Sequence, residues 1–155
     1  GVANKFGVIG DKMNAIAPGK RMLSSMTPTV LLRDGEVAMV IGTQGGSTIF
    51  TSVFQALLNV VEFNMSAEEA VNADRFHHQL PQHDLIRYDR SRSIPDSFVR
   101  HMAEYGYRIE PNSWGDLGKD RLVVRTSTSW DAAADSRSRR STSIVEQLPV
   151  VQPSP

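Results

Sequence analysis

A glycine-rich stretch that joins a strand-like run to a helix-like run constrains this chain more than any other part of its sequence. The residues GTQGGS at positions 42–47 follow the apolar run 37–41 and precede a run with helical periodicity, 48–63. Glycine readily adopts positive φ and lets a ligand approach the backbone closely. A helix start also offers unpaired N–H groups and a positive dipole end, which favour an anion. The stretch predicts an anion-binding loop or, on the plainer interpretation, a tight turn.

The composition excludes several classes of function. The 155 residues suit one domain with a core, or part of a larger one. Lys+Arg and Asp+Glu number 17 each, so net charge does not favour nucleic acid or a membrane surface as a partner. The absence of cysteine excludes disulfides, thiol catalysis and cysteine-based metal sites. Because the chain starts at Gly1 rather than at methionine, we expect a processed or truncated product.

Local patterns predict an α+β fold. Residues 29–32 and 37–41 flank the turn signal Asp34-Gly35 and predict a β-hairpin. Both runs are almost entirely apolar, so we expect both strands to be buried centrally. A second hairpin is predicted at 121–125 and 130–134. Further strands are expected at 6–9, 85–88 and 107–110.

Three helices are predicted from their end signals. The first spans 47–63, with Ser47 or Thr48 as its N-cap and Asn64 ending it in the left-handed region. The capping box from Ser66 to Glu69 opens a second helix that runs to about residue 73. The third helix begins at 95–96 and is closed by a glycine at 106.

Ser24 and Ser25 form the second candidate site element, and we expect them to line one site with the glycine stretch. Their hydroxyls could donate two hydrogen bonds to a carboxylate. The alternative is a turn in which they bond to the local backbone. Neither serine lies in a G-x-S-x-G elbow, so neither is expected to be a nucleophile.

Neither the histidine pair nor the arginines near the C-terminus indicate a further site. His77 and His78 are adjacent on an extended segment, so they point in opposite directions and cannot easily chelate one metal ion. We expect one imidazole to be buried and the other to lie near solvent, with no metal bound. Arg137, Arg139 and Arg140 lie in a Ser-rich stretch, which predicts a solvated end rather than a nucleic-acid site. Residues 136–155 are expected to form a flexible tail.

Three segments together resemble the signature of γ-glutamyltranspeptidases, which belong to the N-terminal-nucleophile hydrolase superfamily. They are NAIAPGKRMLSSMTPT at 14–29, GTQGGS at 42–47 and ADRFHHQ at 73–79, and the resemblance covers about residues 1–135. In that family the precursor cleaves itself, and the new N-terminal Thr of the small subunit attacks the γ-glutamyl carbonyl. The resemblance implies that Ser24 and Ser25 hold the α-carboxylate of the substrate. It also implies that Gly45 and Gly46 form the oxyanion hole. No cofactor is implied.

The chain departs from the family pattern in two ways. Gln44 stands where the family usually has proline, which would fix φ before the glycines. This sequence does not contain the family segments that carry the nucleophilic Thr and the Asp that binds the substrate amine. The resemblance therefore implies that residues 1–135 are the C-terminal part of a small subunit, within a four-layer αββα sandwich. Its partners would be the large subunit, the remainder of the small subunit and a γ-glutamyl small molecule of the glutathione type. The chain alone is expected to be inactive.

Two other functions stay open on sequence grounds. Cephalosporin acylases of the same superfamily take glutaryl groups, and the residue that discriminates between the two substrates lies outside this chain. A non-catalytic module that binds anions is the second alternative. Members of the resembled family are typically periplasmic, secreted or anchored facing outward, so the resemblance implies such a location.

Overall fold

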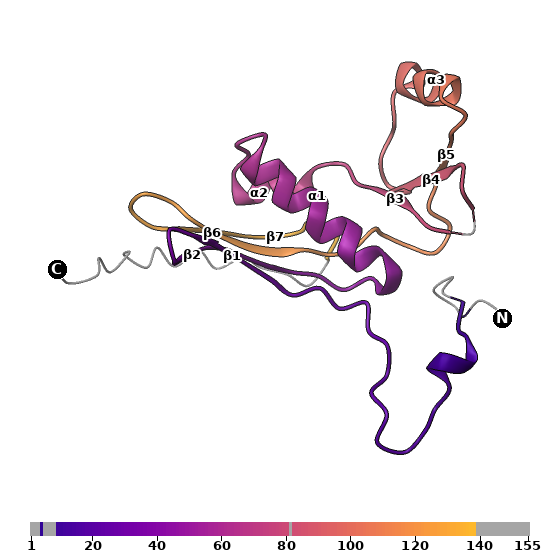
Figure 1. The fold of residues 1–155 in the computed structure, drawn as a ribbon. Helices are drawn as coiled ribbons and strands as arrows, with labels where there is room; N and C mark the ends of the chain where they lie inside the picture. The colour runs from indigo at the N-terminus through magenta and orange to yellow at the C-terminus, as the bar shows by residue number, and fades with distance from the viewer. Residues whose placement is uncertain (1–3, 5–8, 81, 139–155) are drawn as a thin grey trace.

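The described part of the chain folds into two β-sheets and three α-helices, in an α+β arrangement (Figure 1). The computed structural model describes residue 4 and residues 9–80 and 82–138. The predicted strand at 6–9 therefore lies largely outside the described residues, as does most of the predicted tail. The elements in chain order are η1 (Lys12–Asn14), β1 (Thr29–Arg33), β2 (Glu36–Gly42), η2 (Gly46–Thr48), α1 (Ile49–Val61), α2 (Ala67–Asn72), β3 (Phe76–His78), β4 (Leu85–Tyr88), α3 (Asp96–Glu104), β5 (Arg108–Pro111), β6 (Arg121–Arg125) and β7 (Trp130–Ala134).

The larger sheet has four antiparallel strands in the order β1-β2-β6-β7. Its first two strands form the predicted hairpin. Asp34 and Gly35 both take positive φ, at 54° and 82°, as a tight two-residue hairpin turn requires. β6 and β7 form the second predicted hairpin, with Arg121 opposite Ala134. The end of β2, the start of β6 and the end of β7 therefore lie side by side at the same end of the sheet.

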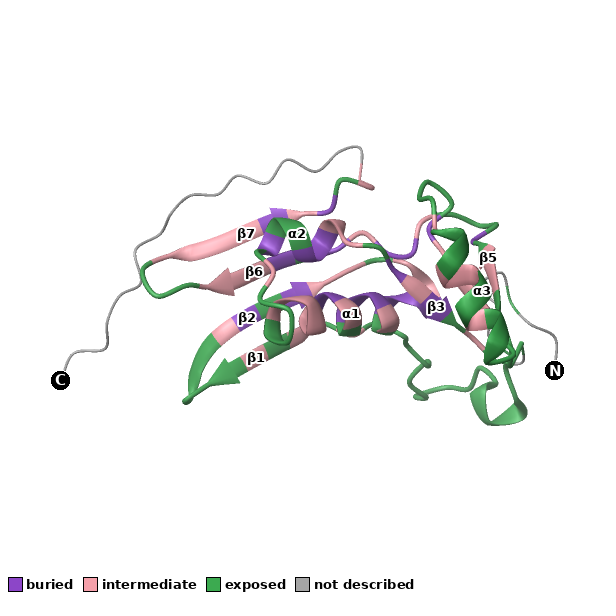
Figure 2. Ribbon diagram, turned by 90° about the horizontal axis from the view of Figure 1, so that it is seen from above, coloured by how far each residue is buried: buried purple, intermediate pink, exposed green. Residues whose placement is uncertain are grey.

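The core lies between one face of this sheet and the helices α1 and α2 (Figures 1 and 2). In β2 the buried Met39 and Ile41 flank the exposed Val40, which is the period of a strand covered on one side. The buried apolar side chains that pack together here are Met39, Ile41, Val53, Ala56, Ala67, Ala70, Val71, Leu122 and Ala133.

The opposite face of the sheet is open, which corrects the expectation of centrally buried strands. Val30 and Val40 pair across β1 and β2, and their side chains are 58% and 42% exposed. Leu32 of β1, which is an edge strand, is exposed as well. The apolar composition of the strands is real, but among the described residues only one of the two faces is covered.

The helix boundaries follow their predicted signals, with one exception. Asn64 has φ 54°, as expected for a left-handed residue after a helix. Ser66 and Glu69 form both hydrogen bonds of the capping box at the start of α2. The exception is the N-terminus of α1, where Thr48 is the cap residue but makes no side-chain cap bond. Its hydroxyl donates instead to the Gly45 carbonyl oxygen, at 3.0 Å.

The smaller sheet has the order β3-β4-β5, with β3 and β4 antiparallel and β4 and β5 parallel. α3 connects the parallel pair and packs against it, and Phe98 of this helix contacts Phe76 of β3 with ring centroids 5.4 Å apart. A membrane-crossing helix would need to be longer and more apolar than any helix found in the described part of the chain.

Candidate functional site

The two candidate loops meet in the structure. The hydroxyl Oγ of Ser25 donates a hydrogen bond of 2.9 Å to the carbonyl oxygen of Gly46, which lies 21 residues further along the chain. Both serines are exposed, whereas the glycines are partly buried. The pair of serines and the pair of glycines therefore lie side by side, with the serine loop on the solvent side.

Ser24 bonds to the local backbone, as the alternative interpretation of this segment as a turn predicts. Its Oγ accepts a hydrogen bond from the backbone N–H of Met26, at 3.1 Å. A hydroxyl that accepts one hydrogen bond still has a proton to donate. Ser24 can therefore donate to an anion directly, whereas Ser25 has to turn its proton away from Gly46 first.

The glycine loop has a conformation that only glycine takes without strain. Gly45 has φ 150° and Gly46 has φ 62°. A Cβ on Gly45 would lie 2.4 Å from Oγ1 of Thr48 and 3.3 Å from Cα of Gly118. Both carbonyl oxygens already accept bonds, that of Gly45 from Thr48 and that of Gly46 from Ser25. Neither glycine N–H donates to another of the described residues, so both remain available to an anion.

A chain of hydrogen bonds supports the helix side of this loop. Ser47 Oγ donates to Oε1 of Gln79 at 2.7 Å, and Nε2 of His77 lies 3.0 Å from the same oxygen. His77 Nδ1 lies 2.9 Å from Oγ1 of Thr51. Burial lowers the pKa of His77 from its ordinary value, with the hydrogen bond to Gln79 opposing and His78 and Arg87 adding to the decrease. Burial thus favours the neutral ring, whose Nε2 faces the amide oxygen of Gln79.

The segment 117–120 supports the other side of the loop. The N–H of Lys119 donates to Oγ1 of Thr43 at 2.7 Å, and Gly118 lies against Gly45. The carbonyl oxygen of Leu117 accepts from Oγ of Ser52 at 2.7 Å. The glycine loop is thus held between the first turns of α1 and this segment.

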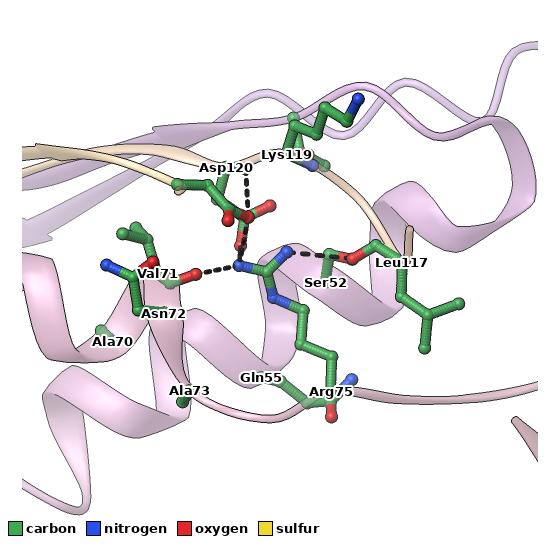
Figure 3. Close-up of polar contacts among 12 residues, drawn as sticks. Ser52, Gln55, Ala70, Val71, Asn72, Ala73, Arg75, Leu117, Lys119 and Asp120 are labelled. Carbon is green, nitrogen blue, oxygen red and sulfur yellow. Dashed lines mark hydrogen bonds and ion pairs between the residues drawn. The ribbon is translucent and has the colours of Figure 1, made fainter. Parts of the chain in front are cut away.

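A buried cluster of five charged side chains, which we call the ion cluster, lies behind that segment, and Figure 3 shows two of its members, Arg75 and Asp120. All five residues sit at or just beyond strand ends. Arg75 precedes β3, Asp120 precedes β6, and the remaining three follow β4 or β7. The members are Arg75, Asp89, Asp120, Asp135 and Arg137, each with a side chain that is 4% exposed or less.

One member of the ion cluster, Arg137, contradicts the prediction made from its sequence. Arg137 was expected at a solvated end, but its guanidinium pairs with Asp89 at 2.8 Å and with Asp135 at 3.1 Å. It also donates to the carbonyl oxygens of Val71 and Ala73. A guanidinium that pairs with two carboxylates and donates to two carbonyl oxygens is stabilised in the protein interior, even when its neighbours in sequence are polar. Residues 139 and 140 lie outside the described residues.

The burial of the two histidines matches the prediction. His77 is buried and His78 is exposed, and their side chains face opposite sides of β3. Within residues 4, 9–80 and 82–138, no group of three or more His, Asp or Glu side chains is placed to hold a metal ion.

Sequence reasoning missed the residues that support the loop. Gly118 lies close to Thr43 and Gly45 of the loop, more than 70 residues away in sequence, and Arg75 reaches Asp120 across 45 residues. No periodicity or spacing connects such distant positions. The one available signal was the occurrence of isolated charges at the ends of predicted strands, since an aspartate before and after a hairpin must end up close together.

Comparisons with known proteins place these loops in one family. The family model described as Gamma-glutamyltranspeptidase matches residues 1–145. The chain is 45% identical over 139 residues to a glutathione hydrolase proenzyme of Pseudomonas aeruginosa, covering 90% of this chain and 25% of that protein. It thus spans a quarter of the length of this relative.

Solved structures agree with the sequence match. A gamma-glutamyltranspeptidase from Pseudomonas nitroreducens complexed with L-DON is 44% identical and superposes with a TM-score of 0.84, over 94% of this chain and 75% of that one. A cephalosporin acylase from Bacillus halodurans has a TM-score of 0.69 at 19% identity, over 79% of this chain and 23% of that one. The second likeness shows a shared fold alone.

Proposed function

The chain belongs to the gamma-glutamyltranspeptidase family, and on that premise we propose that it forms part of an enzyme that transfers or hydrolyses γ-glutamyl groups of glutathione-type substrates. The complete protein, here called the precursor, supplies the nucleophilic Thr and the large subunit from sequence outside these residues. The observation that carries the proposal is the hydrogen bond between Ser25 and Gly46. This bond brings the serine hydroxyls next to the glycine N–H groups, so both kinds of donor face one site.

The glycine N–H groups are assigned the role of oxyanion hole. Attack on the γ-carbonyl turns its oxygen into an oxyanion, which needs donors that are already in position. The N–H groups of Gly45 and Gly46 have no acceptor among the described residues, and the carbonyl oxygens of both are held in place. Such fixed donors stabilise the transition state more than the substrate and therefore raise kcat.

The serine hydroxyls are assigned to the α-carboxylate of the glutamyl group. Ser24 has a free proton, and Ser25 exchanges its bond to the Gly46 carbonyl for one to the carboxylate. A hydrogen bond to a charged group contributes about 1.5–3 kcal/mol. This contact exists in both the bound substrate and the transition state, so its loss raises KM.

The serine role is tested by hydrolysis of a γ-glutamyl anilide by the precursor and its variants. Ser24→Ala/Ser25→Ala removes two such bonds and should raise KM about 100-fold or more, with a smaller change in kcat. Ser127→Ala in the exposed β6–β7 turn, at the opposite end of the sheet, is the matched control and should leave both constants unchanged. An unchanged KM in the double variant contradicts the carboxylate role.

The glycine role is tested in the same assay. Gly45→Ala introduces a Cβ that would lie 2.4 Å from Thr48 Oγ1 at φ 150°, so the loop must distort. We expect kcat to fall by about 100-fold or more. Gly42→Ala is the control, because no atom lies within 4 Å of its Cβ and its φ is not positive. A precursor that hydrolyses a glutaryl anilide in preference to the γ-glutamyl one would favour the acylase alternative, and one that hydrolyses neither would favour a non-catalytic module.

A further inference from the structure

The ion cluster contacts the candidate oxyanion hole through one short segment, residues 117–120. Arg75 donates from Nη1 to the carbonyl oxygen of Leu117 at 3.0 Å and from Nη2 to the carbonyl oxygen of Val71. Figure 3 shows its guanidinium between these two carbonyls, with the carboxylate of Asp120 beside it. One planar side chain thus holds two backbone segments at fixed positions.

Leu117 is held on both of its peptide groups by this cluster. Its N–H donates to Oδ1 of Asp89 at 2.7 Å, while its carbonyl oxygen accepts from Arg75 and Ser52. Arg137 fixes Asp89 in turn, through a 2.8 Å ion pair. The backbone on either side of Leu117 is therefore restrained by an acid on one side and a base on the other.

Gly118, the next residue, is the contact between this segment and the glycine loop. Its Cα lies 3.3 Å from the position of a Cβ on Gly45, and its own φ is 84°. A Cβ on Gly118 would lie 2.5 Å from Oγ of Ser52 and 3.0 Å from Oγ1 of Thr43. The two backbones therefore approach too closely for a side chain at Gly45 or Gly118, and the hydrogen bond from the N–H of Lys119 to Oγ1 of Thr43, at 2.7 Å, ties the segment to the glycine loop.

The charges of the cluster are arranged so that Arg75 cannot be replaced by a simple cation. Its Nη2 lies 3.1 Å from Oδ2 of Asp120 and 2.7 Å from Oδ2 of Asp135, while Nη1 is used by Leu117. Asp120 is fully buried, and no hydrogen bond reaches either of its carboxylate oxygens within the described residues, so Arg75 is its main counter-charge. A lysine would keep the charge but could not serve both carboxylates and both carbonyls from one nitrogen.

We propose that Arg75 is a positioning residue for γ-glutamyl transfer, which fixes Gly45 and Gly46 in the geometry of the oxyanion hole through Leu117 and Gly118. The inference rests on the proposed function of the glycine loop. Arg75 touches no substrate in this arrangement. Its effect is to remove freedom from the donors, which matters because a misplacement of about 1 Å can cost about 100-fold in rate.

The test compares Arg75→Lys with the wild-type precursor in hydrolysis of the γ-glutamyl anilide. We expect kcat, normalised to the amount of self-cleaved enzyme, to fall about 10- to 100-fold with KM changed less than threefold. Arg92→Lys is the matched control, because the Arg92 side chain also pairs with an aspartate and a backbone carbonyl but is exposed, and these partners are Asp74 and Asn72 rather than segment 117–120. This control should keep wild-type constants.

A second variant covers the case in which Arg75→Lys does not fold. Thr43→Val is nearly isosteric and removes the acceptor for the N–H of Lys119, so it loosens the same contact from the other side. It should lower kcat with KM unchanged. Wild-type kcat in folded Arg75→Lys, or in Thr43→Val when the first variant does not fold, overturns the inference.

A binding measurement separates this inference from the proposed function. A phosphonate analogue of the γ-glutamyl group places a charged oxygen where the oxyanion forms, whereas glutamate lacks that geometry. Arg75→Lys should weaken phosphonate binding by about the factor lost in kcat and leave glutamate binding unchanged. A wild-type precursor that neither hydrolyses the anilide nor binds the phosphonate refutes the proposed function. Equal phosphonate affinity in wild type and folded variant refutes only the role of Arg75.

Discussion

At the scale of single residues, His77 shows how a buried imidazole can support a loop through hydrogen bonds. Its Nε2 shares the oxygen of Gln79 with Ser47, which directly follows the glycine pair. The ring also packs edge-on against Phe50 and Trp114, with centroids 6.1 Å and 6.4 Å away. Protonation of this ring would place a charge among largely apolar groups, so burial lowers its pKa.

This environment predicts a pH dependence of stability. The unfolded chain binds a proton on His77 near pH 6.5, whereas the folded chain does so only at lower pH. The stabilising contribution is thus present above pH 6.5 and is lost as pH falls through the folded-state pKa. We expect His77→Gln to reduce the fall in melting temperature of the precursor between about pH 7 and pH 5. His78→Gln, at the exposed neighbour, should follow the wild-type curve, and identical curves for all three proteins would refute the assignment.

Single residues also mark the limit of what the sequence predicts. Ser24, Ser25, Gly45 and Gly46 could be proposed from sequence because each pair is adjacent and lies in a distinctive segment. The direction of each donor was not predictable, since the bond from Ser25 to Gly46 depends on how two loops approach in space. The same holds for Thr48, whose hydroxyl was expected to cap α1 and bonds to Gly45 instead.

At the scale of elements, local sequence signals determine where helices and strands end, whereas long-range packing determines which of their faces are buried. The Asp34-Gly35 turn, the capping box of α2 and the glycine after α3 all act within a few residues, and all three are confirmed. The burial of β1 was predicted from its apolar composition and is wrong on one face. Apolar residues indicate what a strand can bury but not whether a partner is present in the same chain.

The capping box of α2 yields a prediction at this scale. Oγ of Ser66 accepts from the N–H of Glu69, and the carboxylate of Glu69 accepts from the N–H and hydroxyl of Ser66. Ser66→Ala should destabilise the precursor by about 1 kcal/mol, seen as a lower urea midpoint. Ser97→Ala is the control, because Ser97 is exposed inside the first turn of α3 and makes no cap. Equal midpoints for the two variants would show that the box contributes nothing.

At the scale of the whole molecule, the open face of the four-stranded sheet is the main unsatisfied surface of the described chain. Val30, Leu32 and Val40 are exposed on it, and β1 presents an unpaired edge. Exposed apolar strands next to a free edge favour association with other chains. The αββα sandwich implied by the family resemblance would cover this face with a second sheet, and that arrangement stays a prediction.

This surface predicts the behaviour of the 155 residues on their own. The isolated chain should associate into oligomers in size-exclusion chromatography and should not hydrolyse the γ-glutamyl anilide. Val30→Thr/Val40→Thr should shift it toward the monomer, because both positions lie on the open face. Leu80→Gln, which removes an exposed apolar side chain outside the sheets, should not. A monomeric wild-type chain, or an active one, contradicts the prediction.

The pairing of Arg137 with Asp89 has a practical consequence for where this unit can be cut. β7, the last strand among the described residues, ends at Ala134, and a boundary drawn from secondary structure would fall there or just after it. A piece cut at that point would keep Asp89 buried after β4 but lose the guanidinium that faces it. The smallest piece that keeps these charges matched therefore extends through Arg137, three residues beyond the end of β7.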